Sequence, residues 1–336
     1  MKIDLQVVES WERLNETYRQ ALLPFGGIDD TINVQVYLGY QHALHEICQS
    51  LAQIFPHRKT IAYFKHASPA FEPIAIALSK EGFAVKALNF EEMRQPKAWL
   101  DPIQKELLFF MSAFDDPITG ELFQFPEFEQ EIKDKRIFRL TLSHSFHRYF
   151  SLPKPSTYEV RILSLERDRA LMLAGERGKF IPALAPKLNW PADEAPSVQK
   201  LLAPIAPEKY QELQATLLKI KSQLPAEAKA ILPDTVSCLN DRLIFSFSDI
   251  DGLAFIEALA KMTSLNLTAP GEDSDLETTS LCRWDSPRLL GFFSERGFSP
   301  ETIRGLIVIA ADALTKIQPD AIKLAYEQVR KQQLGL

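Results

Sequence analysis

Three arginines lie close together in one stretch of this chain, and their chemistry limits what the stretch can do. The stretch runs from Leu163 to Gly178, contains Arg167, Arg169 and Arg177, and ends in Ala-Gly-Glu-Arg-Gly. A guanidinium, with a pKa above about 12, stays protonated in a protein, so it can hold an anion but cannot become the neutral amine that forms an imine. Whether this stretch serves an enzyme at all is therefore open.

Histidines form the second group with possible chemistry. All six lie before residue 150, and two pairs have the i, i+3 spacing: His42 with His45, and His144 with His147. On a helix such a pair shares one face, and neutral imidazole is a common zinc ligand. Because no cysteine or carboxylate motif accompanies them, we favour surface or pocket-lining positions and predict no metal site.

The composition is that of a globular protein. The 336 residues are 46% hydrophobic and 24% charged, and the formal net charge of -6 gives no electrostatic footprint for nucleic acid. No apolar run approaches the roughly 20 residues of a membrane helix, and the acidic start lacks the features of a signal peptide. We therefore expect a cytoplasmic protein that binds neither membranes nor nucleic acids. The sequence contains no Gly-x-Ser-x-Gly elbow, P-loop or His-Glu-x-x-His motif.

Strand and helix patterns alternate through the first half of the chain. A helical pattern begins at Gly39 and is stopped by Pro56. The segments 60–64, 82–88, 106–112, 136–143 and 158–164 have the patterns of strands, with helices at 73–80 and 128–133. Such alternation predicts a parallel sheet with both faces covered.

A proline-rich segment, 182–207, separates this part from a second group of elements. There we expect helices at 208–224, 253–262 and 321–331 and strands at 242–248 and 303–311. These patterns predict a large domain, residues 31–205, and a small C-terminal domain, residues 206–336. An N-terminal segment, residues 1–30, is expected to pack with the small domain.

The ending Ala174-Gly-Glu-Arg-Gly178 resembles the Ala-Gly-x-Arg-x-Gly signature of aminotransferases of fold type I, class I and II, which use pyridoxal phosphate (PLP). In that family the arginine, here Arg177, follows by eight residues a lysine that forms a Schiff base with PLP. Counting back from Arg177 gives Arg169. Aligning Ser164-Leu-Glu with the family's Ser-x-Ser element gives Arg167 instead, so both registers place an arginine at the lysine position.

Other elements resemble the family in the same order. Gly39, Tyr40 and Gln41 are similar to the helix start that holds the cofactor phosphate. Phe71 is similar to the ring that stacks on the pyridine, although a position in the core would explain it equally well. Asp116 replaces an asparagine near the phenolic oxygen, where a carboxylate would repel the phenolate.

At the same presumed cofactor surface, the register places Ser143 where the family has the aspartate that partners the pyridinium, and Phe146 where it has a tyrosine. Losing that aspartate would impair PLP as an electron sink. Arg304 resembles the arginine that clamps the substrate carboxylate. His144, beside the replaced positions, is the one candidate for a new acid or base.

The resemblance implies an α/β, PLP-dependent transferase-like fold: a large domain with a mostly parallel seven-stranded sheet, a small α/β domain, and a homodimer. Our first hypothesis is an aminotransferase-like protein without Schiff-base catalysis and without a bound cofactor, that is, a pseudoenzyme, a binding protein or a repurposed pocket. The alternative is an active PLP-dependent aminotransferase or lyase with an unrecognised lysine, such as Lys65 or Lys179. A third hypothesis is a protein that binds a phosphate or carboxylate through Arg177 and Arg304.

Overall fold

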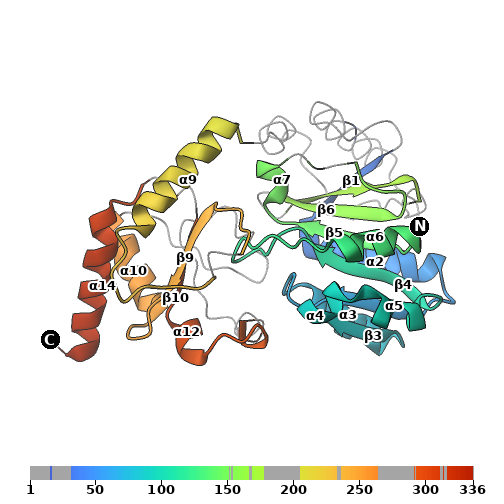
Figure 1. The fold of residues 1–336 in the computed structure, drawn as a ribbon, viewed down its shortest axis with the longest axis horizontal. Helices are drawn as coiled ribbons and strands as arrows, with labels where there is room; N and C mark the ends of the chain where they lie inside the picture. Colours follow the sequence, from blue (N-terminus) through green and yellow to red (C-terminus); the bar gives the residue numbers. More distant parts are fainter. Residues whose placement is uncertain are drawn as a thin grey trace, which may run out of the picture. The chain divides into compact units, whose positions relative to one another are not determined.

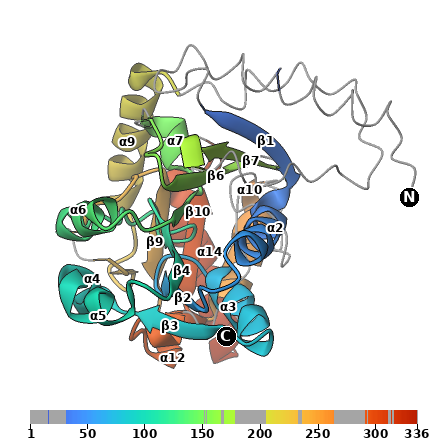
Figure 2. The ribbon, with the colours of Figure 1, turned by 90° about the vertical axis from the view of Figure 1, so that its right-hand side faces the viewer.

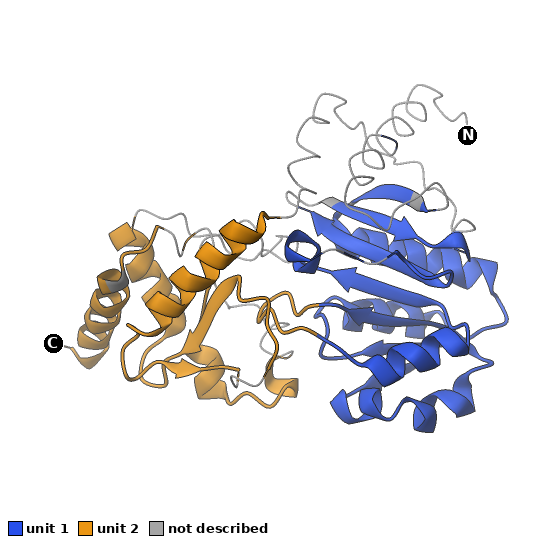
Figure 3. Cartoon of the chain, turned by 45° about the horizontal axis from the view of Figure 1, so that its top comes forward, with its two compact units in different colours: residues 1–114, 123–204 blue, residues 115–122, 205–336 orange. Residues whose placement is uncertain are grey.

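The protein was analysed as a computed structural model, which describes residues 16, 32–150, 152, 154–165, 169–177, 205–232, 236–263, 291, 293–310, 313 and 316–335. The chain forms two compact units (Figure 3). Unit 1 comprises residues 1–114 and 123–204, and unit 2 comprises residues 115–122 and 205–336. Nearly all of the predicted N-terminal segment and of the proline-rich segment, together with Arg167 and Lys179, lie outside the described residues.

Unit 1 is built on a seven-stranded sheet in the order β1-β7-β6-β5-β4-β2-β3 (Figure 1). β6, β5, β4, β2 and β3 run parallel, whereas β7 is antiparallel to both of its neighbours. The strands are β1 (Asn33–Leu38), β2 (Thr60–Phe64), β3 (Ala84–Leu88), β4 (Leu107–Ala113), β5 (Arg139–Ser143), β6 (Glu159–Leu165) and β7 (Arg169–Ala174). The predicted α/β class with a mostly parallel sheet is confirmed.

Helices cover the sheet on both faces (Figure 2). α2 (Gly39–Ile54) and α3 (Phe71–Lys80) lie on one side, and α4 (Phe90–Arg94), α5 (Pro96–Ile103) and α6 (Pro126–Asp134) lie on the other. A four-residue helix, α7 (Phe146–Tyr149), follows β5. Every residue of β4 is buried, because a central parallel strand packs against helices on both of its faces.

The β6–β7 hairpin is tight and was not predicted. Leu165 and Arg169 are paired directly, so only residues 166–168 connect the two strands. β7 then pairs along its whole length with β1, from Arg169 opposite Leu38 to Ala174 opposite Asn33. Alanine, leucine and methionine dominate β7 and favour helices by propensity, so burial between two strands overrides the local preference.

Unit 2 contains a three-stranded antiparallel sheet in the order β10-β9-β8. Its strands are β8 (Lys229–Ala230), β9 (Arg242–Ser246) and β10 (Leu306–Ala310), and its helices are α9 (Pro207–Lys221), α10 (Gly252–Thr263), α12 (Pro300–Arg304) and α14 (Pro319–Leu334). α10 packs against α14 and β10, and α9 contacts β9. These elements enclose a core that includes Phe245, Phe247 and Phe255.

The predicted strand at 303–311 is interrupted at its start. Ser299 Oγ accepts a hydrogen bond from the backbone N–H of Thr302, and Pro300 occupies the first turn of α12. Serine at the N-cap followed by proline is a strong helix-start signal, which the sequence pattern of apolar residues concealed. Arg304 therefore ends a short helix, and the strand begins only at Leu306.

Candidate functional site

The candidate site of unit 1 lies at the edge of the sheet where its parallel strands end. Ser143, the last residue of β5, pairs with Leu163 of β6, and Leu165 ends β6 opposite Arg169. Arg169 in turn is opposite Leu38, which immediately precedes Gly39 and α2. Open α/β sheets bind their ligands outside the carboxyl ends of parallel strands. This edge is therefore the place to look for a ligand.

The start of α2 lies at this edge and has a conformation that favours an anion. Gly39 has φ +70°, the left-handed region that glycine adopts without strain, so the chain turns sharply from β1 into the 16-residue helix. The first turn of an α-helix directs backbone N–H groups and the positive end of the helix dipole at an anion. Tyr40 in this turn packs edge-on against the ring of His144, with 5.2 Å between the ring centroids.

Ser143 belongs to a buried polar pair that the sequence did not reveal. Its Oγ accepts a hydrogen bond from the backbone N–H of His147 at 3.2 Å and lies 3.0 Å from Nδ1 of the same residue. Burial, and secondarily the charge of Arg148, lowers the pKa of His147 to about 3. The pair is thus neutral near pH 7, and it lacks the negative charge that an aspartate at position 143 would supply. The i, i+4 spacing of Ser143 and His147 was the available signal.

The two predicted aromatic positions are packing residues in this structure. Phe71 is fully buried at the first residue of α3 and belongs to the main core cluster of unit 1. Phe146 stacks on Phe114, with centroids 5.2 Å apart, and contacts Phe150. A role for either ring beside a cofactor stays a prediction.

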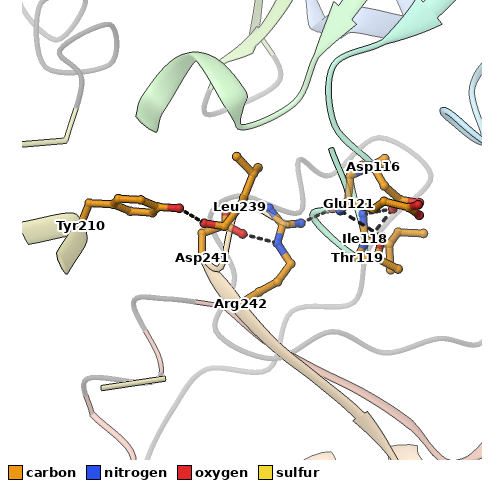
Figure 4. Close-up of polar contacts among 9 residues, drawn as sticks. Asp116, Ile118, Thr119, Glu121, Tyr210, Leu239, Asp241 and Arg242 are labelled. Carbon is orange, nitrogen blue, oxygen red and sulfur yellow. Dashed lines mark hydrogen bonds and ion pairs between the residues drawn. The ribbon is translucent and has the colours of Figure 1, made fainter. Parts of the chain in front are cut away.

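Asp116 belongs to unit 2, where its carboxylate already has partners. Oδ1 accepts hydrogen bonds from the backbone N–H groups of Ile118 at 2.7 Å and Thr119 at 2.8 Å (Figure 4). Oδ2 forms an ion pair with Arg296, which also pairs with Glu121. The expected repulsion of a phenolate by Asp116 is therefore corrected, because Arg296 compensates its charge and the carboxylate holds its own loop.

The same loop is tied to the start of β9. Arg242 donates to the carbonyl oxygen of Pro117 and forms a bidentate pair with Asp241, with N···O distances of 2.6 and 2.7 Å (Figure 4). Burial, together with the negative charge of Asp116, raises the pKa of Glu121 against the opposing effect of Arg296. We assign this network to the architecture of unit 2. Nothing in the sequence pattern pointed to Arg296 as its centre.

Arg177 does not share the edge with Gly39. It lies beyond Ala174, at the opposite end of β7 from Arg169, and its backbone N–H donates to the carbonyl oxygen of Thr157. The five residue steps from Arg169 to Ala174 alone span about 17 Å of strand. The match to the Ala-Gly-x-Arg-x-Gly signature therefore does not bring Arg177, which is exposed, to the start of α2. Arg304 is exposed at the end of α12 in unit 2.

Gly175, the first glycine of the Ala-Gly-Glu-Arg-Gly ending, is required by the close packing of the backbone around it. A Cβ atom at this position would lie 1.9 Å from the backbone oxygen of Ser156. The backbone N–H of Gly175 also donates to the carbonyl oxygen of Glu159 at 2.9 Å. The glycine thus permits close approach of β7 to the chain entering β6, which is a structural role.

We expect Gly175→Ala to destabilise unit 1 by about 3 kcal/mol or more, because two backbone segments must move apart to admit the methyl group. Urea unfolding followed by circular dichroism would measure the change. Gly291→Ala is the matched control, since a Cβ atom there meets nothing within 4 Å. Equal stability of the two variants would contradict the structural role of Gly175.

Neither suggested substitute lysine gains support. Lys65 follows β2, and its charge contributes to lowering the pKa of Glu92, the α4 carboxylate that also pairs with Lys86. Lys65 thus lies within electrostatic reach of the far edge of the sheet, where β3 is located. Lys179 is outside the described residues. Within the part of the chain that the structure describes, no cluster of metal-ligating side chains occurs and no helix is long and apolar enough to cross a membrane.

The sequence matches no protein-family model and no curated protein. Solved structures, in contrast, are similar over nearly the whole chain. The cysteine desulfurase CsdA from Escherichia coli has a TM-score of 0.66 at 12% identity, covering 97% of this chain and 86% of its own. A NifS-like protein has a TM-score of 0.65 at 13% identity, covering 98% and 89%. A probable N-succinyldiaminopimelate aminotransferase from Thermus thermophilus has a TM-score of 0.54 at 14% identity, covering 95% and 84%.

These comparisons correct one expectation and confirm another. The expectation that no cofactor is bound is not upheld, because the structural neighbours are PLP-dependent proteins, which suggests PLP binding. The resemblance to the PLP-dependent superfamily is confirmed at the level of the fold, since neighbours with desulfurase, aminotransferase and decarboxylase names share the architecture. The chain has the fold of the PLP-dependent fold type I proteins.

Proposed function

We propose that this protein binds PLP reversibly, with the phosphate at the start of α2, and that it forms no covalent bond between PLP and a lysine of the β6–β7 hairpin. The observation that carries the proposal is the pairing of Arg169 with Leu38, one residue before the helix start at Gly39. A helix N-terminus favours a phosphate, and an arginine at position 169 keeps a permanent positive charge and cannot form an imine.

The residues at this edge fit the phosphate and a neutral pyridine ring. Gly39 allows the backbone to turn into α2, and the Ser143–His147 pair offers hydrogen bonding without charge. Bound PLP acts as an electron sink mainly when its ring nitrogen is protonated, which a neutral partner does not favour. The hairpin residues Glu166 to Arg169 include no amine that could attack the aldehyde.

The proposed protein is thus an aminotransferase-like binding protein or one with a repurposed pocket. From the fold resemblance we also propose a homodimer, and from the sequence a protein of the cytoplasm. Arg304 stays a candidate for holding a substrate carboxylate, as a surface arginine of unit 2. His144 stays the candidate acid or base, because its contact with Tyr40 links the end of β5 to the start of α2.

Equilibrium dialysis with PLP, followed by borohydride reduction and peptide mass spectrometry, tests the proposal. We expect saturable binding of PLP, complete loss of the ligand on further dialysis before reduction, and no lysine peptide carrying a reduced adduct. A stoichiometric adduct on one lysine would support the alternative, an active enzyme of the family. Failure to bind PLP at any concentration would reject the proposed ligand.

A further inference from the structure

A cavity in unit 1 lies beside α6, and its lining includes the first residues of β5 and β6 as well as Phe114, which follows β4. It has a volume of about 820 Å³ and is bounded by the end of α6, the segment 154–158 and the first residues of β5 and β6. Small-molecule sites have volumes of roughly 300 to 1,000 Å³. The cavity is thus large enough for a metabolite.

Positive charge dominates the lining of this cavity. Its cationic side chains are Lys133, Arg136, Arg139, Lys154 and Arg161, whereas its carboxylates are Glu129 and Glu159. Ser156 and Thr157 add hydroxyl groups. Five cations against two carboxylates produce a local excess of positive charge in a chain whose net charge is -6. Such an excess favours an anionic ligand.

The two arginines that β5 and β6 contribute to the lining already have partners within the protein. Arg161 donates to both oxygens of Glu159, at 2.8 and 2.9 Å, and both side chains are buried. Arg139 donates to Ser112 Oγ at 3.0 Å and lies 3.6 Å from Glu129. These contacts hold the guanidinium groups in place, so this part of the lining is preorganised and less of its charge is left for a ligand.

Lys133 and Arg136, at the end of α6, differ from these two arginines because neither forms an ion pair with another residue that the structure describes. Both lie near the helix C-terminus, where cations are favourable, and this explains Lys133 without a ligand. The same reason favours a cation at position 136, but the backbone conformation there favours glycine.

Arg136 has φ +53°, in the left-handed region that favours glycine. The N–H of Arg136 donates to the carbonyl oxygen of Lys133, and that of Ile137 to the carbonyl oxygen of Ile132. Helices that end in this way usually have glycine at the left-handed position. A strained arginine facing a cationic cavity indicates that its guanidinium has a use there.

We propose that this cavity binds a small phosphorylated molecule carrying at least two negative charges. A phosphate or diphosphate group would accept from Arg136 and Lys133 together, whereas a single carboxylate would compensate only one of these two charges. The site uses none of the residues assigned to PLP. It therefore goes beyond the proposed function and does not rest on it.

The test uses pyrophosphate as the probe and sodium chloride at matched ionic strength as the reference. Hydrogen–deuterium exchange is expected to slow in residues 132–139 and 154–161 with pyrophosphate only. In calorimetry, the variant Lys133→Gln/Arg136→Gly should bind at least tenfold more weakly. Its melting temperature should be unchanged or higher, because glycine relieves the strained backbone at position 136.

A second double variant, Lys80→Gln/Arg94→Gln, is the matched control. It also removes two exposed cations from the ends of helices in unit 1, here α3 and α4, and should bind pyrophosphate within about twofold of the unchanged protein. Arg169→Gln should likewise preserve the exchange protection, which separates this site from the PLP site. Protection no greater than with chloride, or equal weakening in both double variants, would overturn the proposal.

Discussion

Replacing Arg169 with glutamine should weaken reversible PLP binding about tenfold or more. A hydrogen bond to a charged group contributes roughly 1.5–3 kcal/mol, and each 1.4 kcal/mol is a factor of ten in the dissociation constant. The backbone of Arg169 pairs with Leu38, which immediately precedes the start of α2, so this variant removes a positive charge from the strand residue opposite the helix start. Equilibrium dialysis against PLP measures the change.

Arg169→Lys tests whether an amine at the same position forms the covalent bond with PLP that arginine cannot form. A lysine can lose its proton when neighbouring positive charge or burial lowers its pKa, and the helix N-terminus supplies positive potential here. We expect this variant to yield a borohydride-stable adduct at position 169, where the unchanged protein yields none.

Arg177→Gln is the control for both changes, since this exposed arginine lies at the other end of β7. It should bind PLP as the unchanged protein does. If Arg177→Gln weakened binding while Arg169→Gln did not, the position of the site at the α2 edge would be wrong.

The second large effect concerns stability. Glu159→Gln should cost about 3–5 kcal/mol, because it leaves the buried guanidinium of Arg161 without its charged partner. Urea unfolding at pH 7 would report the loss. Lys97→Gln removes an exposed lysine that pairs with Glu131, which keeps Lys135 as a partner; it should cost less than about 1 kcal/mol and serves as the control.

The pH dependence follows from the same pair. Burial alone would raise the pKa of Glu159, but Arg161, Arg139 and the backbone N–H of Ser156 together lower it below its ordinary value. The carboxylate of a glutamate in the unfolded chain has a pKa of about 4.3. The stabilisation by Glu159 is therefore complete above that pH and disappears as the pH falls through the lower pKa of the folded state. In Glu159→Gln this acid-dependent part should be missing from the unfolding curve.

Much of the fold was predictable because its central elements have strong local patterns. β2 and β4 are continuous apolar runs, and α2 has both an amphipathic face and a clear start at Gly39. β1 and β7 were missed for a physical reason. Among the described strands, β1 pairs only with β7, which lies far along the chain, and the residues of β7 favour helix until β1 and β6 enclose them.

The candidate site was predictable only in part. The start of α2 and Ser143 lie at one edge, as the resemblance implied, but Arg177 was assigned there from a spacing of residues in the chain. An eight-residue interval keeps two residues together when it is a loop and separates them when most of it is an extended strand. Asp116 likewise required knowledge of Arg296, which is 180 positions away in the sequence.

Residues 115–122 belong to unit 2 although the segments on both sides of them belong to unit 1, and this affects whether either unit can be produced as a separate fragment. The chain passes between them at three points, after Phe114, after Leu122 and after Pro204, so unit 2 is not a simple C-terminal piece. A fragment of residues 205–336 would lack the carboxylates of Asp116 and Glu121 and the carbonyl of Pro117. Arg296 would then lose both of these carboxylates, and Arg242 would lose the carbonyl of Pro117 while keeping its pair with Asp241. During synthesis on the ribosome, residues 115–122 must await most of the remaining chain before their ion pairs can form.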